Sequence, residues 1–254
     1  MNIELTFTKF HRMIGKTASH PLIDSIRSQY FPYEIYANES TGMTALKQGD
    51  TYYHPEELLA MMMSQAKAMT KDYSGRGVKD CVLTVPSYFT QHERSALYAA
   101  ADMADLNVLS LIEENTAAAL HFGIDRVFDE PHNVLIYNMG ASMIQVTIVT
   151  YSSYPTKGDG KNKTVGQFQV VGKAWDTQTG GFNFDLHIAE ILADRFNINW
   201  HKKKNGAGQD VRQHVRPMTR LRMESTKIRE VLSANNEYPY KVDGLHADVD
   251  LNTK

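Results

Sequence analysis

Short apolar, β-branched runs alternate with helical stretches along most of the chain, and this alternation limits the fold more than any other feature. The pattern predicts a buried strand at 81–85, a helix at 91–104, a strand at 108–111 and a helix at 115–122 that Gly123 closes. Strands and helices interleaved in this way are typical of an α/β protein. No second globule separated by a linker is visible in the sequence.

The remaining segments extend this α/β pattern. Leu58, Met62, Ala66 and Met69 recur at helical spacing after Pro55, and they predict a core-facing stripe. A further helix is expected at about 183–196, and a long amphipathic helix runs between Val211 and Leu232. Residues 133–137 and 143–150 form two strands of a hairpin, and the polar segment 154–164 is expected to be a surface loop.

Composition excludes several functional classes. The 254 residues include 27 Lys and Arg against 29 Asp and Glu, so the net charge is -2. Such a balance argues against nucleic-acid binding through a basic surface. Cys81 is the single cysteine, which excludes an internal disulfide and a cysteine-based zinc cluster. No run of eighteen apolar residues occurs, so no membrane span is expected.

The N-terminal residues lack the features of a secretory signal peptide, which predicts either a cytosolic protein or a chain whose beginning is missing. Two glycosylation sequons, at Asn38 and Asn162, gain meaning only beside other evidence for a secretory compartment.

Small residues follow the strand at 133–137 directly, in the order Asn138-Met139-Gly140-Ala141-Ser142. Small side chains at such a turn let backbone N–H groups approach a phosphate. On the pattern alone, an ordinary β-hairpin turn explains these residues better. The segment Gly15-Lys16-Thr17 lacks the earlier glycine and the preceding strand of a P-loop, and the sequence contains no Gly-x-Ser-x-Gly elbow.

Several ordered segments resemble signatures of the heat shock protein 70 family, and together they span nearly the whole chain. They are residues 82–89, 106–120, 133–149, 176–181 and 220–233. The family usually has proline where this chain has Asn115, and this difference favours similarity to the family's branch of large endoplasmic-reticulum chaperones. The resemblance implies an actin-like ATPase (ribonuclease-H-like) fold of two lobes, represented here without its two ends.

The resemblance also implies a division into four parts. Residues 1–55 correspond to part of the peripheral subdomain of lobe I, and residues 56–127 to its core subdomain. Residues 128–180 correspond to part of the lobe II core subdomain, and residues 181–254 to part of its peripheral subdomain.

Family positions for catalysis fall on substituted residues. His11 stands where the family has its catalytic lysine, and neutral imidazole replaces a permanent cation poorly. Met143 stands where a threonine orients water, and Gln145 replaces an aspartate. Glu114 is retained, and with Asn138, which replaces an aspartate, it would hold magnesium through water.

Nucleotide contacts carry over by position as well. The phosphate positions are Asn138, Gly140, Ala141, Ser142 and Gly181. The adenosine positions are Thr226, Arg229, Glu230 and Ser233, of which Thr226 and Glu230 differ from the family's glutamate and arginine.

These matches imply an ATP- or ADP-binding chaperone domain with magnesium, acting in the lumen of the endoplasmic reticulum under stress. The implied partners are an ordinary chaperone of the same compartment and unfolded client proteins. Several groups that would stabilise the transition state are substituted together, so nucleotide binding is expected to be retained while hydrolysis is weak or lost. Whether the chain hydrolyses ATP stays an open question. The alternatives are a hydrolysis-independent exchange factor or scaffold, a sugar-kinase-like enzyme without an evident base, and a fragment without activity of its own.

Overall fold

The computed structural model describes residues 6–158, 161–202 and 209–253, which fall into two compact units. The first unit joins residues 1–55 with 181–254, and the second comprises residues 56–180. No helix in these ranges is both long and apolar enough to cross a bilayer. The expected division into four subdomains stays a prediction from the resemblance.

The first unit combines two small antiparallel sheets with two long helices. Its N-terminal part holds η2 (Phe10–Arg12), α1 (Pro21–Arg27) and the sheet β1-β2-β3 (Glu34–Ala37, Thr44–Gln48, Thr51–Tyr53). Its C-terminal part holds α5 (Gly181–His201), η3 (Val211–Gln213), α6 (Val215–Leu232) and the hairpin of β9 (Tyr240–His246) and β10 (Val249–Thr253).

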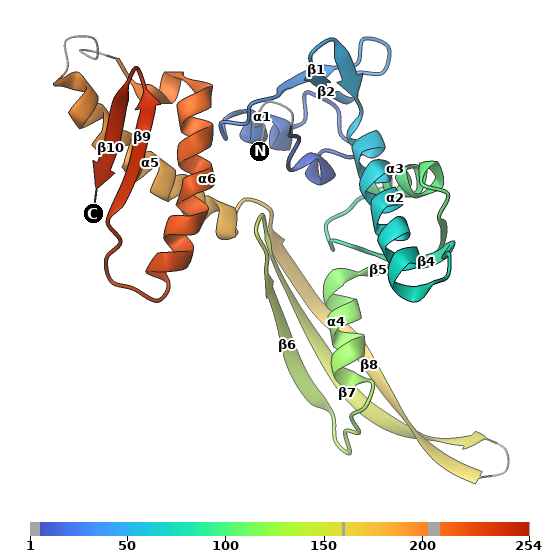
Figure 1. Ribbon diagram of the computed structural model, residues 1–254. Coiled ribbons are helices and arrows are strands. Elements are labelled where there is room, and N and C mark those ends of the chain that lie inside the picture. Colours follow the sequence, from blue (N-terminus) through green and yellow to red (C-terminus); the bar gives the residue numbers. More distant parts are fainter. Residues whose placement is uncertain (1–5, 159–160, 203–208, 254) are drawn as a thin grey trace. The chain divides into compact units, whose positions relative to one another are not determined.

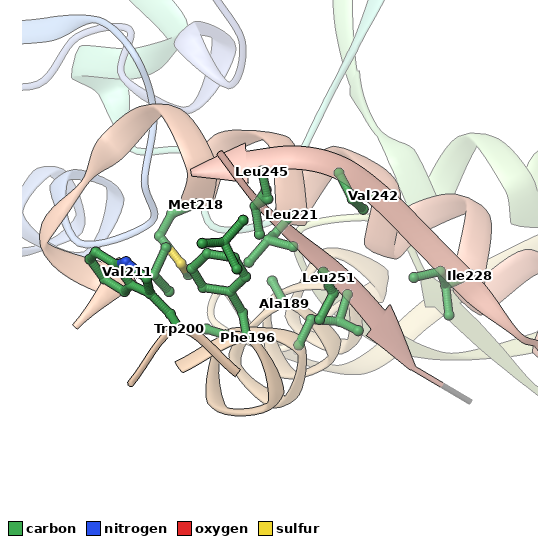
Figure 2. Close-up of a cluster of buried hydrophobic side chains, with 13 residues drawn as sticks. Ala189, Phe196, Trp200, Val211, Met218, Leu221, Ile228, Val242, Leu245 and Leu251 are labelled. Carbon is green, nitrogen blue, oxygen red and sulfur yellow. The ribbon is translucent and has the colours of Figure 1, made fainter. Parts of the chain in front are cut away.

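The C-terminal part closes around one apolar core, drawn in Figure 2. Helices α5 and α6 contribute one side of this core, and the β9–β10 hairpin contributes the other. Trp200 and Phe196 of α5 are its largest members, and both are almost fully buried. The long amphipathic helix predicted after Val211 is therefore confirmed, although Val211 itself lies in η3 and the helix begins at Val215.

An aromatic and cationic stack ties the first fifty-five residues to the long helices of this unit. The ring of Phe31 stacks on Tyr33 and on Phe182, with centroids 5.4 Å and 5.9 Å apart. The Arg222 guanidinium lies 4.3 Å from the Phe31 ring centroid, and the Lys9 ammonium lies 3.1 Å from that of Phe182. Residues far apart in sequence thus share one packing cluster.

The second unit contains two sheets and three helices. Helix α2 (Pro55–Ser74) begins it and is followed by the parallel pair β4 (Asp80–Val85) and β5 (Asn107–Glu113), with α3 (Gln91–Met103) between them. Helix α4 (Glu114–Gly123) then leads into the antiparallel sheet β6 (His132–Met139), β7 (Ile144–Gly158) and β8 (Lys161–Asp176). Helix α4 lies along one face of that sheet (Figure 1).

Tight packing of α4 on β7 explains why position 123 is glycine. A β-carbon on Gly123 would lie 2.5 Å from a ring carbon of Tyr151, whose hydroxyl donates a 2.7 Å hydrogen bond to the Ala119 carbonyl. The helix includes Gly123, and the following Ile124 is right-handed. Gly123 is therefore required by close approach, and its expected role as the left-handed closing residue was wrong.

Three other expectations were wrong in the described structure. Leu58 at the start of the α2 stripe is buried, but Met62, Ala66 and Met69 are exposed, so most of that stripe does not face a core. Strand β4 alternates in burial and exposes 56% of Val82. In the segment 154–164, which was expected to be a loop, residues 154–158 and 161–164 instead continue the long pairing of β7 with β8, and residues 159–160 lie outside the described structure.

Candidate functional site

The turn between β6 and β7 contains the small residues Gly140, Ala141 and Ser142, and we call it the small-residue turn. Its chain reversal is closed by a 2.9 Å hydrogen bond from the Gly140 N–H to the Met143 carbonyl. Asn138 and Gln145 face each other in the strand register just before and after the turn. Ser142 is buried within the turn, whereas Ala141 is exposed.

Gly180 lies against this turn more closely than any other residue type permits. A β-carbon there would meet the Ala141 carbonyl oxygen at 2.7 Å and the Met143 backbone nitrogen at 2.8 Å. The turn before Gly180 is fixed by Asp176, whose carboxylate accepts hydrogen bonds from the Thr179 hydroxyl at 2.6 Å and the Gln178 N–H at 2.7 Å. These bonds lower the pKa of Asp176.

A polar network joins the ends of three strands beside the small-residue turn. The Ser87 N–H, just after β4, donates to Gln145 Oε1 at 2.8 Å, and Gln145 Nε2 donates to Glu114 Oε2 at 2.6 Å. Glu114 is the first residue of α4, directly after β5, and Gln145 is 1% exposed. We call Ser87, Gln145 and Glu114 the Gln145 bridge.

Glu113 extends this network on the side of β8. Its carboxylate lies 2.6 Å from the Lys173 ammonium and 3.8 Å from the Arg94 guanidinium, and it accepts a 3.0 Å hydrogen bond from the Ser87 hydroxyl. Two protein cations thus surround Glu113. Sequence reasoning missed Ser87, Glu113 and Lys173, because only the pairing of distant strands brings them together.

The expected magnesium residues offer a poor donor set for a divalent ion. Mg²⁺ prefers carboxylate, phosphate and water oxygens. Glu114 supplies one carboxylate, and one of its oxygens already accepts from an amide, while Asn138 and Gln145 are neutral. No group of three or more His, Cys, Asp or Glu side chains suited to a metal occurs in the described ranges. The magnesium role of Glu114 and Asn138 stays a prediction from the resemblance.

In the other unit, the structure brings together some of the expected adenosine residues. Asp185 of α5 is 5% exposed. Its carboxylate accepts hydrogen bonds from Arg229 Nε at 2.6 Å and from the Thr226 hydroxyl at 3.0 Å. The bond to Asp185 raises the pKa of Arg229. Sequence reasoning missed Asp185, because its partners Thr226 and Arg229 belong to another helix.

The other two adenosine candidates lie at the end of α6. Glu230 is exposed, and Ser233 caps the helix, its hydroxyl donating to the Glu230 carbonyl at 2.6 Å. Gly181 is the first residue of α5, whose first turn carries no acidic side chain. The positive end of that helix dipole is therefore not neutralised locally.

His11 lies in η2, within a strongly cationic neighbourhood. His11 keeps an exposed surface, but desolvation by the surrounding protein, together with the adjacent Arg12 and Lys9 charges, lowers the pKa of His11 and favours the neutral imidazole. Burial, Arg12 and Arg222 also lower the pKa of Lys9 to about 7. The correspondence of His11 to the family's catalytic lysine stays a prediction from the resemblance.

The fold and the small-residue turn define an α/β protein with the actin-like ATPase fold. The family model described as "Hsp70 protein" matches residues 1–254 of this chain. The chain therefore belongs to the Hsp70 family.

Curated relatives agree with this assignment. The chain is 35% identical to Hypoxia up-regulated protein 1 of Xenopus tropicalis over 100% of its own length and 39% of that protein. It is 38% identical to Heat shock 70 kDa protein 17 of Arabidopsis thaliana over 96% of its length and 28% of that protein. The similarity to the large branch is thus confirmed. The chain spans well under half the length of these relatives.

Proposed function

We propose that this chain is the nucleotide-binding part of an Hsp70-family chaperone that binds ATP or ADP and supports protein folding under stress. The single observation that carries the proposal is the match of the Hsp70 family model to the whole chain. The close fit of Gly180 under the turn of Gly140, Ala141 and Ser142 adds support, because that fit keeps the turn's backbone free of neighbouring side chains on one side.

In this proposal, hydrolysis is weak or lost. Phosphoryl transfer depends on positioned charge and oriented water, and each lost donor costs on the order of 100-fold in rate. Neutral His11, Met143 and Gln145 remove a cation, a hydroxyl and a carboxylate from family positions. Binding needs fewer of these groups than the chemical step does.

The alternative is a hydrolysis-independent exchange factor or scaffold for an ordinary chaperone of the endoplasmic reticulum. The residues His11, Asn138 and Met143 at substituted family positions favour this alternative over an active ATPase. The proposed compartment is the lumen of the endoplasmic reticulum, where the ordinary chaperone and unfolded clients are the proposed partners. The name of the Xenopus relative, Hypoxia up-regulated protein 1, agrees with a stress role.

Calorimetric titration with ATP, run beside a phosphate-release assay, tests the proposal. We expect saturable binding of ATP and ADP with turnover near the buffer background. Brisk turnover would reject the hydrolysis-independent alternative, and absence of binding to both nucleotides would reject nucleotide binding itself. A Gly180→Ala variant provides the site control, since its β-carbon would displace the small-residue turn.

A further inference from the structure

Gln145 has a fixed orientation within the Gln145 bridge. A backbone N–H can only donate a hydrogen bond, so the Ser87 N–H at 2.8 Å identifies the facing end of the Gln145 amide as its oxygen. The NH₂ end must then face Glu114, as the 2.6 Å contact to Glu114 Oε2 requires. Burial of Gln145 to 1% exposure leaves little room for another rotamer.

The orientation matters because of what the amide does for the carboxylate. A carboxylate at position 145 would place a second negative charge within hydrogen-bond distance of Glu114. Two facing carboxylates need a proton or a cation between them. With Gln145 in place of a carboxylate, Glu114 is the only charged member of the pair, and the Gln145 NH₂ group donates a hydrogen bond to it. The pair therefore needs neither a shared proton nor a cation.

The surrounding charges are balanced by the protein itself. Glu113 is paired with Lys173 at 2.6 Å and approached by Arg94 at 3.8 Å. Asn138, opposite Gln145 in the strand register, is also neutral. Glu113 and Glu114 are thus compensated by protein N–H groups and cations.

We propose that Gln145 takes the place of a divalent cation, so that nucleotide binding by this chain does not depend on Mg²⁺. Gln145 is a positioning residue in this role: it holds Glu114 to Ser87 and ties the start of β7 to the ends of β4 and β5. The inference rests on the proposed nucleotide binding, but its structural half concerns the bridge alone and has its own test.

The structural half is tested by thermal unfolding of the 254-residue chain without nucleotide, in EDTA and in millimolar Mg²⁺. Wild type should melt at the same temperature in both. Gln145→Glu keeps an acceptor for the Ser87 N–H but faces Glu114 with a second charge. It should melt about 5 °C lower in EDTA and recover part of that loss in Mg²⁺.

A charge exchange keeps the test decisive if Gln145→Glu folds poorly. The double variant Gln145→Glu/Glu114→Gln swaps the amide and the carboxylate, and it should regain stability that is independent of Mg²⁺. Gln167→Glu, an exposed change on β8, is the matched control and should show no Mg²⁺ effect. Stabilisation of wild type by Mg²⁺, or a Gln145→Glu variant as stable as wild type in EDTA, would overturn the inference.

The binding half uses ATP titrations of the same proteins. Wild type should bind ATP with a Kd that differs less than threefold between EDTA and Mg²⁺, whereas Gln145→Glu should bind at least tenfold more weakly in EDTA. A tenfold weakening of wild type in EDTA would overturn the inference. If wild type binds no ATP under either condition, the proposed function and the binding half fail together, and the melting experiment still decides the role of the bridge.

Discussion

Gly180 and Ala141 lie so close that a β-carbon on Gly180 would come within 2.7 Å of the Ala141 carbonyl oxygen. The neighbouring atom is backbone and cannot swing away as a side chain would. This close approach therefore couples the position of Gly180, in the turn after β8, to that of the small-residue turn between β6 and β7.

Gly180→Ala should displace the small-residue turn and weaken ATP binding at least tenfold, with a loss of about 1–3 kcal/mol in the free energy of unfolding. Calorimetry and urea unfolding measure the two effects. Gly77→Ala serves as control, because its β-carbon would meet nothing within 4 Å. Equal ATP affinity in both variants would contradict the coupling.

Gly123→Ala should destabilise the packing of α4 on β7. Its β-carbon would lie 2.5 Å from a Tyr151 ring atom, and Tyr151 is 2% exposed and tethered through its hydroxyl. We expect a loss of about 1–3 kcal/mol in urea unfolding. Gly172→Ala on β8 has open space and should cost far less; a similar loss for both variants would refute the packing argument.

Lys9→Met should raise the free energy of unfolding at pH 7. Burial and the Arg12 and Arg222 charges lower the pKa of Lys9 from 10.5 to about 7, so the unfolded chain binds a proton that the folded chain releases. Wild-type stability should therefore rise between pH 7 and pH 10, by roughly 2 kcal/mol after allowing for solvent screening.

The Lys9→Met variant should lack that rise, so the difference between the two proteins shrinks as the pH increases. Urea unfolding at pH 7, 8.5 and 10 measures it. Lys71→Met, an exposed change on α2, controls for general loss of a cation. Parallel pH profiles for wild type and Lys9→Met would show that Lys9 is not the responsible group.

His246 should make the C-terminal core of the first unit sensitive to acid. Its ring lies 4.3 Å from that of His214 and 5.0 Å from Trp200, measured between centroids. Burial and the His214 charge lower the pKa of His246 below 6.5. The unfolded chain therefore takes up the proton first, so this stabilising effect is present above about pH 6.5 and is lost as the pH falls through the folded pKa.

Fluorescence provides the measurement, since Trp175→Phe leaves Trp200 as the single tryptophan. In that background, His246→Phe should keep the aromatic contact and flatten the loss of stability between pH 7 and pH 5. His121→Gln, an exposed change on α4, should leave it unchanged. An unaltered pH profile in His246→Phe would exclude this histidine.

Local patterns in the sequence were sufficient for most helices and strands. The β-branched run before Pro86, the helix between Gln91 and Met103, and the strand that ends in the small-residue turn all follow from neighbouring residues. Ordered motifs were also sufficient for the family, because they recur at fixed spacing along the whole chain. The apolar periodicity correctly predicted the helix α2 but not the exposure of its apolar side chains. Periodicity places residues on one helix face, whereas their burial depends on which other element packs against that face.

Tertiary structure alone decided how the site is charged. The resemblance predicts that Gln145 stands where the family has an acid. Its hydrogen bonds from the Ser87 N–H and to the Glu114 carboxylate, however, join segments at three separate strand ends. The same holds for Asp185, which gathers Thr226 and Arg229 from another helix. Spacing along a chain determines periodicity, whereas the partner of a buried polar group depends on which distant segments pack together, and only the folded arrangement fixes that.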